Sequence, residues 1–279
     1  MFERISRGME LAKQSWHVLQ EEKSLVVFPL LSGLACMFVL ASFAVPLWFT
    51  GYAQQVLGEE QLQNDPIAWV LLFAFYFVNY FVIVFFNSAL ISCAIVRFHG
   101  GDATVSDGLS AAASRLPQII AWALVSATVG VILKAIESRS QRVGQIASSL
   151  LGAAWSIVTY FVVPVLVVEG LGPIDAVKRS FAILRKTWGE SLVSQFSVGL
   201  IVTLASLAAI IPGVLGVISG NMIAAVIGIT ISAVLLIVIS LVSAALHTII
   251  IAALYLYAAK GEVPRQFDEA LLRSAYTQK

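Results

Sequence analysis

Long stretches without any charged residue dominate the chain and predict its secondary structure. Asp, Glu, Lys and Arg are absent from residues 24–58, 66–96, 116–133, 143–168 and 191–259. A helix needs roughly 20 apolar residues to cross the hydrocarbon core of a bilayer, so the last stretch has room for two helices. Their break is predicted at Pro212-Gly213, with the turn-forming residues Gly216 and Gly220-Asn221 close behind. The pattern therefore predicts six membrane-spanning helices, near residues 25–50, 67–97, 117–136, 144–168, 190–211 and 222–258.

The segments that flank these stretches carry charges and repeat their apolar residues at steps of three and four. That period is typical of an amphipathic helix lying in the membrane interface. The apolar positions are Phe2, Ile5, Met9, Ala12, Trp16 and Leu19 in the first segment, Val105, Leu109, Ala112 and Leu116 in a weaker second one, Ile174, Val177, Phe181, Leu184 and Trp188 in the third, and Phe267, Ala270 and Leu271 in a short last one.

Glycines follow the second, fourth and sixth predicted spans at Gly101, Gly170 and Gly261, each with Thr or Pro three residues later. Glycine suits the end of a helix, and Pro or Thr suits the start of the next one. We therefore expect an all-α membrane protein with a single membrane domain over residues 1–279. It would contain three helix-pair repeats of about 1–101, 102–170 and 171–261, closed by an amphipathic helix over 262–279. The alternative is that such linkers arise in any membrane protein with an even number of spans, without duplication.

Composition and charge placement agree with a membrane location and give it an orientation. Hydrophobic residues make up 59% of the chain and charged residues 12%, whereas soluble domains are about 25% charged. Of the 17 Lys and Arg residues, only Lys134, Arg139 and Arg142 fall on the side opposite the termini of a six-span protein. Basic residues gather on the cytoplasmic side of membrane proteins. The sequence thus predicts the cytoplasmic (inner) membrane, with both termini in the cytoplasm.

One set of polar residues within the predicted spans is a candidate site. Asn87, Ser156 and His247 each lie fourteen residues before one of the three register glycines, in otherwise apolar tracts. Polar side chains in hydrocarbon are costly unless they find partners. If the repeats pack around a pseudo-threefold axis, the three would converge and line a polar path or hold a head group. The alternative is that each only bonds its own or an adjacent helix as part of packing.

The third amphipathic segment carries a second candidate surface. Its basic residues Lys178, Arg179, Arg185 and Lys186 are expected to contact lipid head groups, and Glu169 is expected to form an ion pair with this helix. No HExxH, G-x-S-x-G or phosphate-binding glycine loop occurs, so we expect no enzyme activity, metal or cofactor. No basic patch with interleaved aromatics is present, which argues against a nucleic-acid partner.

Several short motifs recur in a recognisable order along the chain. They are Phe2-Glu3-Arg4-Ile5, Ser15-Trp16-His17-Val18-Leu19, Phe86-Asn87-Ser88-Ala89-Leu90, Arg115-Leu116-Pro117-Gln118-Ile119, the run 162–170, and Arg185-Lys186-Thr187-Trp188-Gly189-Glu190. These motifs resemble an uncharacterised bacterial and archaeal family of polytopic membrane proteins. The resemblance covers nearly the whole chain, and it implies that Asn87 and Glu169 are motif positions. The arrangement of expected amphipathic helices and spans is also similar to the membrane region of some glycerophosphodiester phosphodiesterases.

These observations favour a non-enzymatic membrane module that organises or binds lipid, or anchors a partner, at the cytoplasmic face. Its expected partners are membrane lipids, another copy of the chain or a second membrane protein. The first alternative is a passive channel or facilitator that uses Asn87, Ser156 and His247. A third hypothesis is a membrane enzyme that acts on lipid head groups at the interface.

Overall fold

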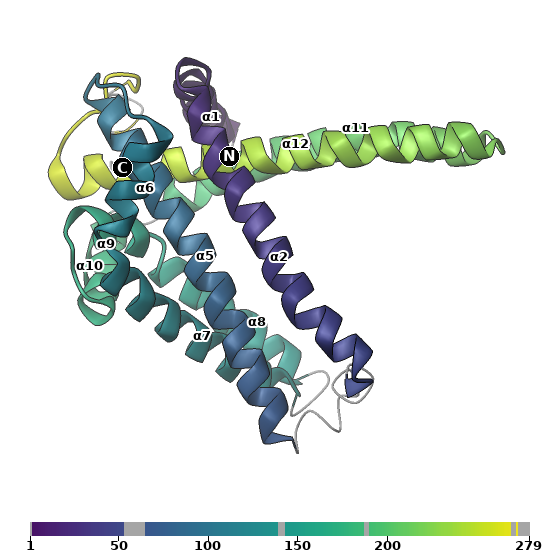
Figure 1. Cartoon of the computed structure of the whole chain (residues 1–279). Helices are drawn as coiled ribbons and strands as arrows, with labels where there is room; N and C mark the ends of the chain where they lie inside the picture. Colours follow the sequence, from purple (N-terminus) through teal and green to yellow (C-terminus); the bar gives the residue numbers. More distant parts are fainter. Residues whose placement is uncertain (1, 53–64, 139–142, 187–189, 269–271, 273–279) are drawn as a thin grey trace. The chain divides into compact units, whose positions relative to one another are not determined.

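The computed structural model describes residues 2–52, 65–138, 143–186, 190–268 and 272. For residues 2–8, 186, 190–198 and 200 it describes only the backbone. Within these ranges the secondary structure is helical and contains no strand, as the all-α prediction requires. Figure 1 shows the helices in chain order.

Six helical segments are long and apolar enough to cross a membrane, which confirms the predicted number of spans. Continuous apolar composition explains these segments, because a lone strand or loop in hydrocarbon would leave its backbone groups without hydrogen bonds. The helices that form them are α2 (Val27–Phe49), α5 (Pro66–Phe98), α7 (Leu116–Ser138), α8 (Val143–Val158) with α9 (Val162–Val168), α11 (Glu190–Ile218) and α12 (Met222–Tyr255).

The turn between the last two spans lies later than predicted. Pro212 is inside α11, and the chain reverses at Ser219 and Gly220, where Gly220 has a positive φ of 67°. Asn221 then caps α12 by accepting hydrogen bonds from the Ile223 and Ala224 amides. The turn predicted at Pro212-Gly213 is therefore wrong. In the structure the Gly213 amide donates to the Ser232 hydroxyl of the paired helix at 2.8 Å, so the helix tolerates the proline.

The fourth span is interrupted instead of continuous. Residues 159–161 separate α8 from α9, and Pro164 follows in the first turn of α9. A proline lacks the amide hydrogen that a helix needs and favours the first turn after a break. The sequence predicted one span over 144–168, and the structure divides it into two helical pieces.

One compact unit contains residues 1–29, 93–103 and 185–279. It holds α1 (Phe2–Glu21), the end of α5, and the paired helices α11 and α12. The two paired helices lie side by side along their length, and α1 contacts both of them (Figure 1). Small residues allow the close pairing, because a Cβ built on Gly228 would lie 2.3 Å from the Pro212 carbonyl oxygen.

The second compact unit contains residues 30–92 and 104–184. It holds most of α2 and α5, together with α6 (Val105–Ala113), α7, α8, α9 and nearly all of α10 (Pro173–Lys186). Trp122 of α7 and Trp155 of α8 stack with ring centroids 5.7 Å apart. Within this unit α7 packs against α8, and buried residues of α9 complete the core at the end that carries α10.

The C-terminal segment differs from its prediction. Residues 256–260 form one turn of π-helix after α12, and 262–268 form turns instead of the start of an amphipathic helix. The Arg265 amide donates to the Phe98 carbonyl at 3.3 Å, and Phe267 packs edge-on against Phe98. These contacts with the end of α5 compete with helix formation over 262–268. Most of the remaining predicted helix, including Ala270, Leu271 and Ser274, lies outside the described residues.

Candidate functional site

Helices α1 and α10 share one pattern of burial. Over residues 11–20 and 176–185 the order of buried, half-buried and exposed side chains is the same at every position. Ser15 and Ser180 occupy equivalent, fully buried positions in the two helices. The weaker middle helix follows the same order over 108–114, where Ala112 takes the place of the serines. Duplication of one helical unit would produce this register, and the three-unit repeat itself stays a prediction.

The exposed positions in this shared pattern carry large apolar side chains. Trp16 is 42% exposed and Phe181, its equivalent, 48% exposed. Met9 in α1 and Ile174 in α10, each seven residues before the exposed aromatic, are also exposed. The sequence placed all four on the same apolar stripe as Leu19 and Leu184, but only the two leucines are buried. Phe2, Ile5 and Trp188 of the predicted stripes have no described side chains.

Each predicted apolar stripe is only partly buried, because each helix turns an adjacent face toward its neighbours. Val18 and Leu19 in α1, and Ile183 and Leu184 in α10, are buried together with the serines. Each helix consequently has a buried face that contains a serine, and a separate exposed apolar position. Leaving a large apolar side chain exposed is unfavourable in water but favourable in the membrane interface.

Ser180 links α10 to the interruption between α8 and α9. Its hydroxyl donates to the Val158 carbonyl at 2.7 Å and accepts from the Phe161 amide at 3.0 Å. The break leaves these two backbone groups without their usual helical partners, and a buried backbone group without a partner is costly. The buried serine therefore satisfies both sides of the break. In the sequence, Ser180 is one serine within an amphipathic pattern, and that pattern does not predict that it bridges a break.

The basic residues of α10 differ in their surroundings. Arg179 donates to both oxygens of Glu169, at 3.0 and 3.1 Å, which confirms the ion pair predicted for Glu169. Lys178 lies 3.5 Å from Asp175 on the exposed surface, and Arg185 is exposed. Lys186 ends α10, and its side chain is outside the described residues. Of the four basic residues predicted to contact lipid, Arg179 is thus already paired with a carboxylate of the protein.

Arginine side chains cover glycines at two helix ends. Arg115 donates to the Val167 carbonyl at 3.1 Å and lies over Gly170, where a Cβ would be 2.8 Å from its guanidinium. In the other unit the Arg265 guanidinium lies in the same way over Gly100. A cation at a helix C-terminus favours the negative end of the helix dipole. In the sequence, Arg115 begins one of the motifs, but nothing there predicts that Arg115 or Arg265 covers a glycine.

The predicted polar set is divided between the two units. Asn87 on α5 is half-buried, and Ser156 on α8 is exposed and donates to the Gly152 carbonyl of its own helix at 3.0 Å. His247 lies on α12 in the other unit and is half-buried. The passive channel that these residues would line stays a prediction. Solute flux from liposomes, compared for wild type and Asn87→Leu, would test it.

The register that selected these three residues needs one correction. The glycines that end α5, α9 and the last helix with positive φ are Gly100, Gly170 and Gly261, at 83°, 68° and 70°. Gly101 was predicted to cap the first copy and does not, because the left-handed position that favours glycine falls one residue earlier. Counted from Gly100, the residue fourteen positions back is Phe86 instead of Asn87.

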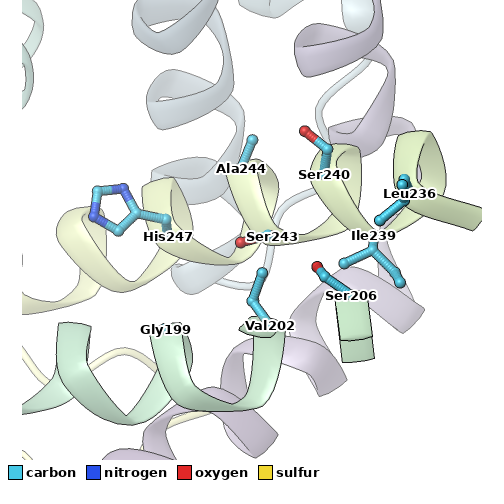
Figure 2. A pocket seen from close by; sticks show the side chains of 9 residues that line it. All are labelled: Gly199, Val202, Ser206, Leu236, Ile239, Ser240, Ser243, Ala244 and His247. Atoms are coloured by element: carbon cyan, nitrogen blue, oxygen red, sulfur yellow. The ribbon is translucent and has the colours of Figure 1, made fainter. Parts of the chain in front are cut away.

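His247 lies at one end of a groove between α11 and α12. The groove has a volume of about 670 Å³, and Figure 2 shows Val202 and Ser206 of α11 projecting into it toward α12. Its lining contains hydroxyls and an imidazole among small and branched apolar side chains, and no charged residue. The lining residues are Gly199, Val202, Ser206, Leu236, Ile239, Ser240, Ser243, Ala244 and His247.

Comparison with known proteins identifies one family. A family of unknown function (DUF6159) matches residues 66–264, from the first residue of α5 to the segment after the π-helical turn. No match was found among curated proteins. The similarity to the membrane region of glycerophosphodiester phosphodiesterases therefore stays a prediction from the arrangement of the helices.

Proposed function

The chain belongs to this family of unknown function, and from that premise we propose that it is a non-enzymatic membrane module that binds anionic lipid head groups through α1 and α10. The supporting observation is the shared burial pattern of the two helices, which leaves Trp16 and Phe181 exposed. Exposed aromatic side chains suit the boundary between head groups and acyl chains. The module would sit at the cytoplasmic face, where anionic lipids attract basic residues.

The charges near the exposed aromatics favour an anionic lipid. Lys13 and Lys178 occupy equivalent positions in the shared pattern, and both side chains are largely exposed. Each has a nearby carboxylate three residues earlier, at 4.0 Å for Glu10 and 3.5 Å for Asp175. Exposed pairs of this kind contribute little to stability, so both lysines remain available to a phosphate group. Arg185 adds an exposed cation on α10.

Retention of lipid by the purified full-length protein tests the proposal. Native mass spectrometry in mild detergent would compare the phosphatidylglycerol and phosphatidylcholine that stay bound. We expect phosphatidylglycerol to be favoured. The double reversal Lys178→Glu with Arg185→Glu should reduce its retention at least about thirtyfold, since each basic residue near an anionic surface contributes about 1 kcal/mol. Arg179 is kept, because its replacement would also break the contact with Glu169.

Lys134→Glu is the matched control. Lys134 also pairs with a carboxylate three residues away in sequence, Glu137, at 3.2 Å, and it lies on the side predicted to face away from the cytoplasm. The control should leave phosphatidylglycerol retention unchanged. Equal retention of the two lipids by wild type, or equal losses in both variants, would refute lipid binding by α10 and leave its exposed face for a protein partner.

A further inference from the structure

The groove between α11 and α12 exists because the pairing of the two helices is tight only near their turn. There, a Cβ on Gly216 would lie 2.5 Å from the Ala224 carbonyl oxygen, and Gly213 bonds Ser232 directly. Further from the turn, Val202, Ser206 and Ser243 replace the glycines, and the groove opens between them (Figure 2). Gly199 also lines the groove, and a Cβ built on it would meet nothing within 4 Å, whereas Gly213 and Gly216 are in close contact with α12.

The hydroxyls that line the groove differ from others on the same helices. Thr203 donates to the Gly199 carbonyl at 2.7 Å, Thr230 to Val226 at 2.8 Å and Thr248 to Ala244 at 3.0 Å. Across the described part of the chain, the Ser206 and Ser243 hydroxyls make no hydrogen bond. A hydroxyl without a partner in an apolar medium is unfavourable. Both hydroxyls line the groove, so they are available to an occupant that can hydrogen-bond with them.

The position of the groove restricts what the occupant can be. Ser243 is separated from Lys260, the next charged residue along the chain, by roughly 25 Å of helix at a rise of 1.5 Å per residue. Ser206 is similarly far from Glu190, and residues 191–259 carry no Asp, Glu, Lys or Arg. A charged head group would lose its hydration here without gaining an ion partner from α11 or α12. An uncharged occupant therefore fits the groove better.

From these observations we propose that the groove binds a neutral lipid, meaning an uncharged hydrophobic molecule with a hydroxyl or carbonyl oxygen. Its oxygen would pair with the Ser206 and Ser243 hydroxyls, and its hydrocarbon part would lie on Val202, Leu236 and Ile239. A volume of about 670 Å³ is within the range of roughly 300–1,000 Å³ that small-molecule sites have. The residues of this site differ from those of the proposed function.

Photolabelling of the full-length protein in nanodiscs tests this site. The probe is a diacylglycerol with a diazirine in one acyl chain, and the reference is phosphatidylcholine with the same chain. We expect diacylglycerol to label α11 and α12 peptides several-fold more than phosphatidylcholine does. Ser206→Ala with Ser243→Ala should lower that labelling about tenfold, because two hydrogen bonds of about 0.5–1.5 kcal/mol are lost.

Three controls separate binding from folding and from the first proposal. Thr203→Val with Thr230→Val removes hydroxyls that bond their own helices and should leave labelling unchanged. Unlabelled diacylglycerol should compete with the probe on wild type, and hexadecane should not, which needs no variant at all. The serine variant should keep its phosphatidylglycerol retention. Equal labelling by both probes, or full labelling of the serine variant, would overturn the neutral-lipid site and leave the groove to water or acyl chains.

Discussion

Helices α1 and α10 have the same burial pattern but use their buried serines differently. Ser15 donates to the Leu11 carbonyl of its own helix at 2.8 Å, whereas Ser180 bridges two backbone groups at the break between α8 and α9. One residue earlier, Gln14 accepts from the Asp268 amide at 3.3 Å, and Arg179 pairs with Glu169. The comparison shows that one amphipathic pattern can place a helix without deciding what its polar residues hold together.

The largest difference in unfolding free energy between the two helices is expected when Ser180 and Ser15 are replaced. Ser180→Ala would leave the Phe161 amide and the Val158 carbonyl without partners, at a cost of roughly 1–3 kcal/mol for each buried group. Ser15→Ala removes only a local bond and should cost less than about 1 kcal/mol. Unfolding in mixed detergent micelles would measure both free energies. Equal losses would mean that Ser180 does not stabilise the break.

Gln14 and Arg179, which precede the two serines, should show the same contrast with smaller losses of unfolding free energy. Arg179→Ala removes the Nε–H group from which both oxygens of Glu169 accept. The Glu169 side chain is 17% exposed, and the loss should destabilise by roughly 1–2 kcal/mol after allowance for solvent. Gln14→Ala loses one neutral hydrogen bond on the surface and should change stability by less than about 1 kcal/mol. The same unfolding measurement applies. A larger loss for Gln14→Ala would contradict the assignment.

The exposed aromatics should separate stability from membrane contact. Trp16→Ala and Phe181→Ala should each change the unfolding free energy in detergent by no more than about 0.5 kcal/mol, because neither side chain belongs to a buried core. Quenching of Trp16 by brominated lipids, in a variant that keeps Trp16 as its only tryptophan, would report its depth. Absence of quenching would place this face away from the bilayer.

The smallest effect concerns the C-terminal segment, which contacts the end of α5. Its contact includes His99 and Glu262, whose atoms approach to 3.0 Å. The hydrogen bond with Glu262 raises the pKa of His99, and the bond to the Ile95 carbonyl adds to it, while Arg265 acts in the opposite direction.

Because the folded pKa is raised, this contact should stabilise the protein below the ordinary histidine pKa of 6.5 and lose its effect as pH rises through the folded value. The melting temperature of wild type should therefore fall slightly more between pH 6 and pH 8 than that of Glu262→Gln. Identical pH dependences would show that the ion pair contributes nothing. The exposed surroundings of both groups keep the effect small.

Sequence alone determined the membrane character and the number of spans, and it predicted a helical segment before the first span and another after the fourth. These features depend on local composition and period, since a charge-free run of sufficient length has few alternatives to a spanning helix. The ion pair of Glu169 was also predictable, because its partner Arg179 lies only ten residues later, on the next helix. The turn at Ser219 and the break at 159–161 were not, since prolines at 164 and 212 have different effects in different surroundings.

Only the tertiary structure decided which polar groups have partners. Ser180 and Ser206 look alike in the sequence, yet one bridges a broken span and the other faces a groove. Likewise, Arg115 lies over Gly170 and Arg265 lies over Gly100, although the two residues of each pair are distant in the sequence. Hydrophobic pattern fixes which residues enter the membrane, because burial is not directional. Hydrogen bonds are directional, so their partners depend on contacts between helices that the pattern does not contain.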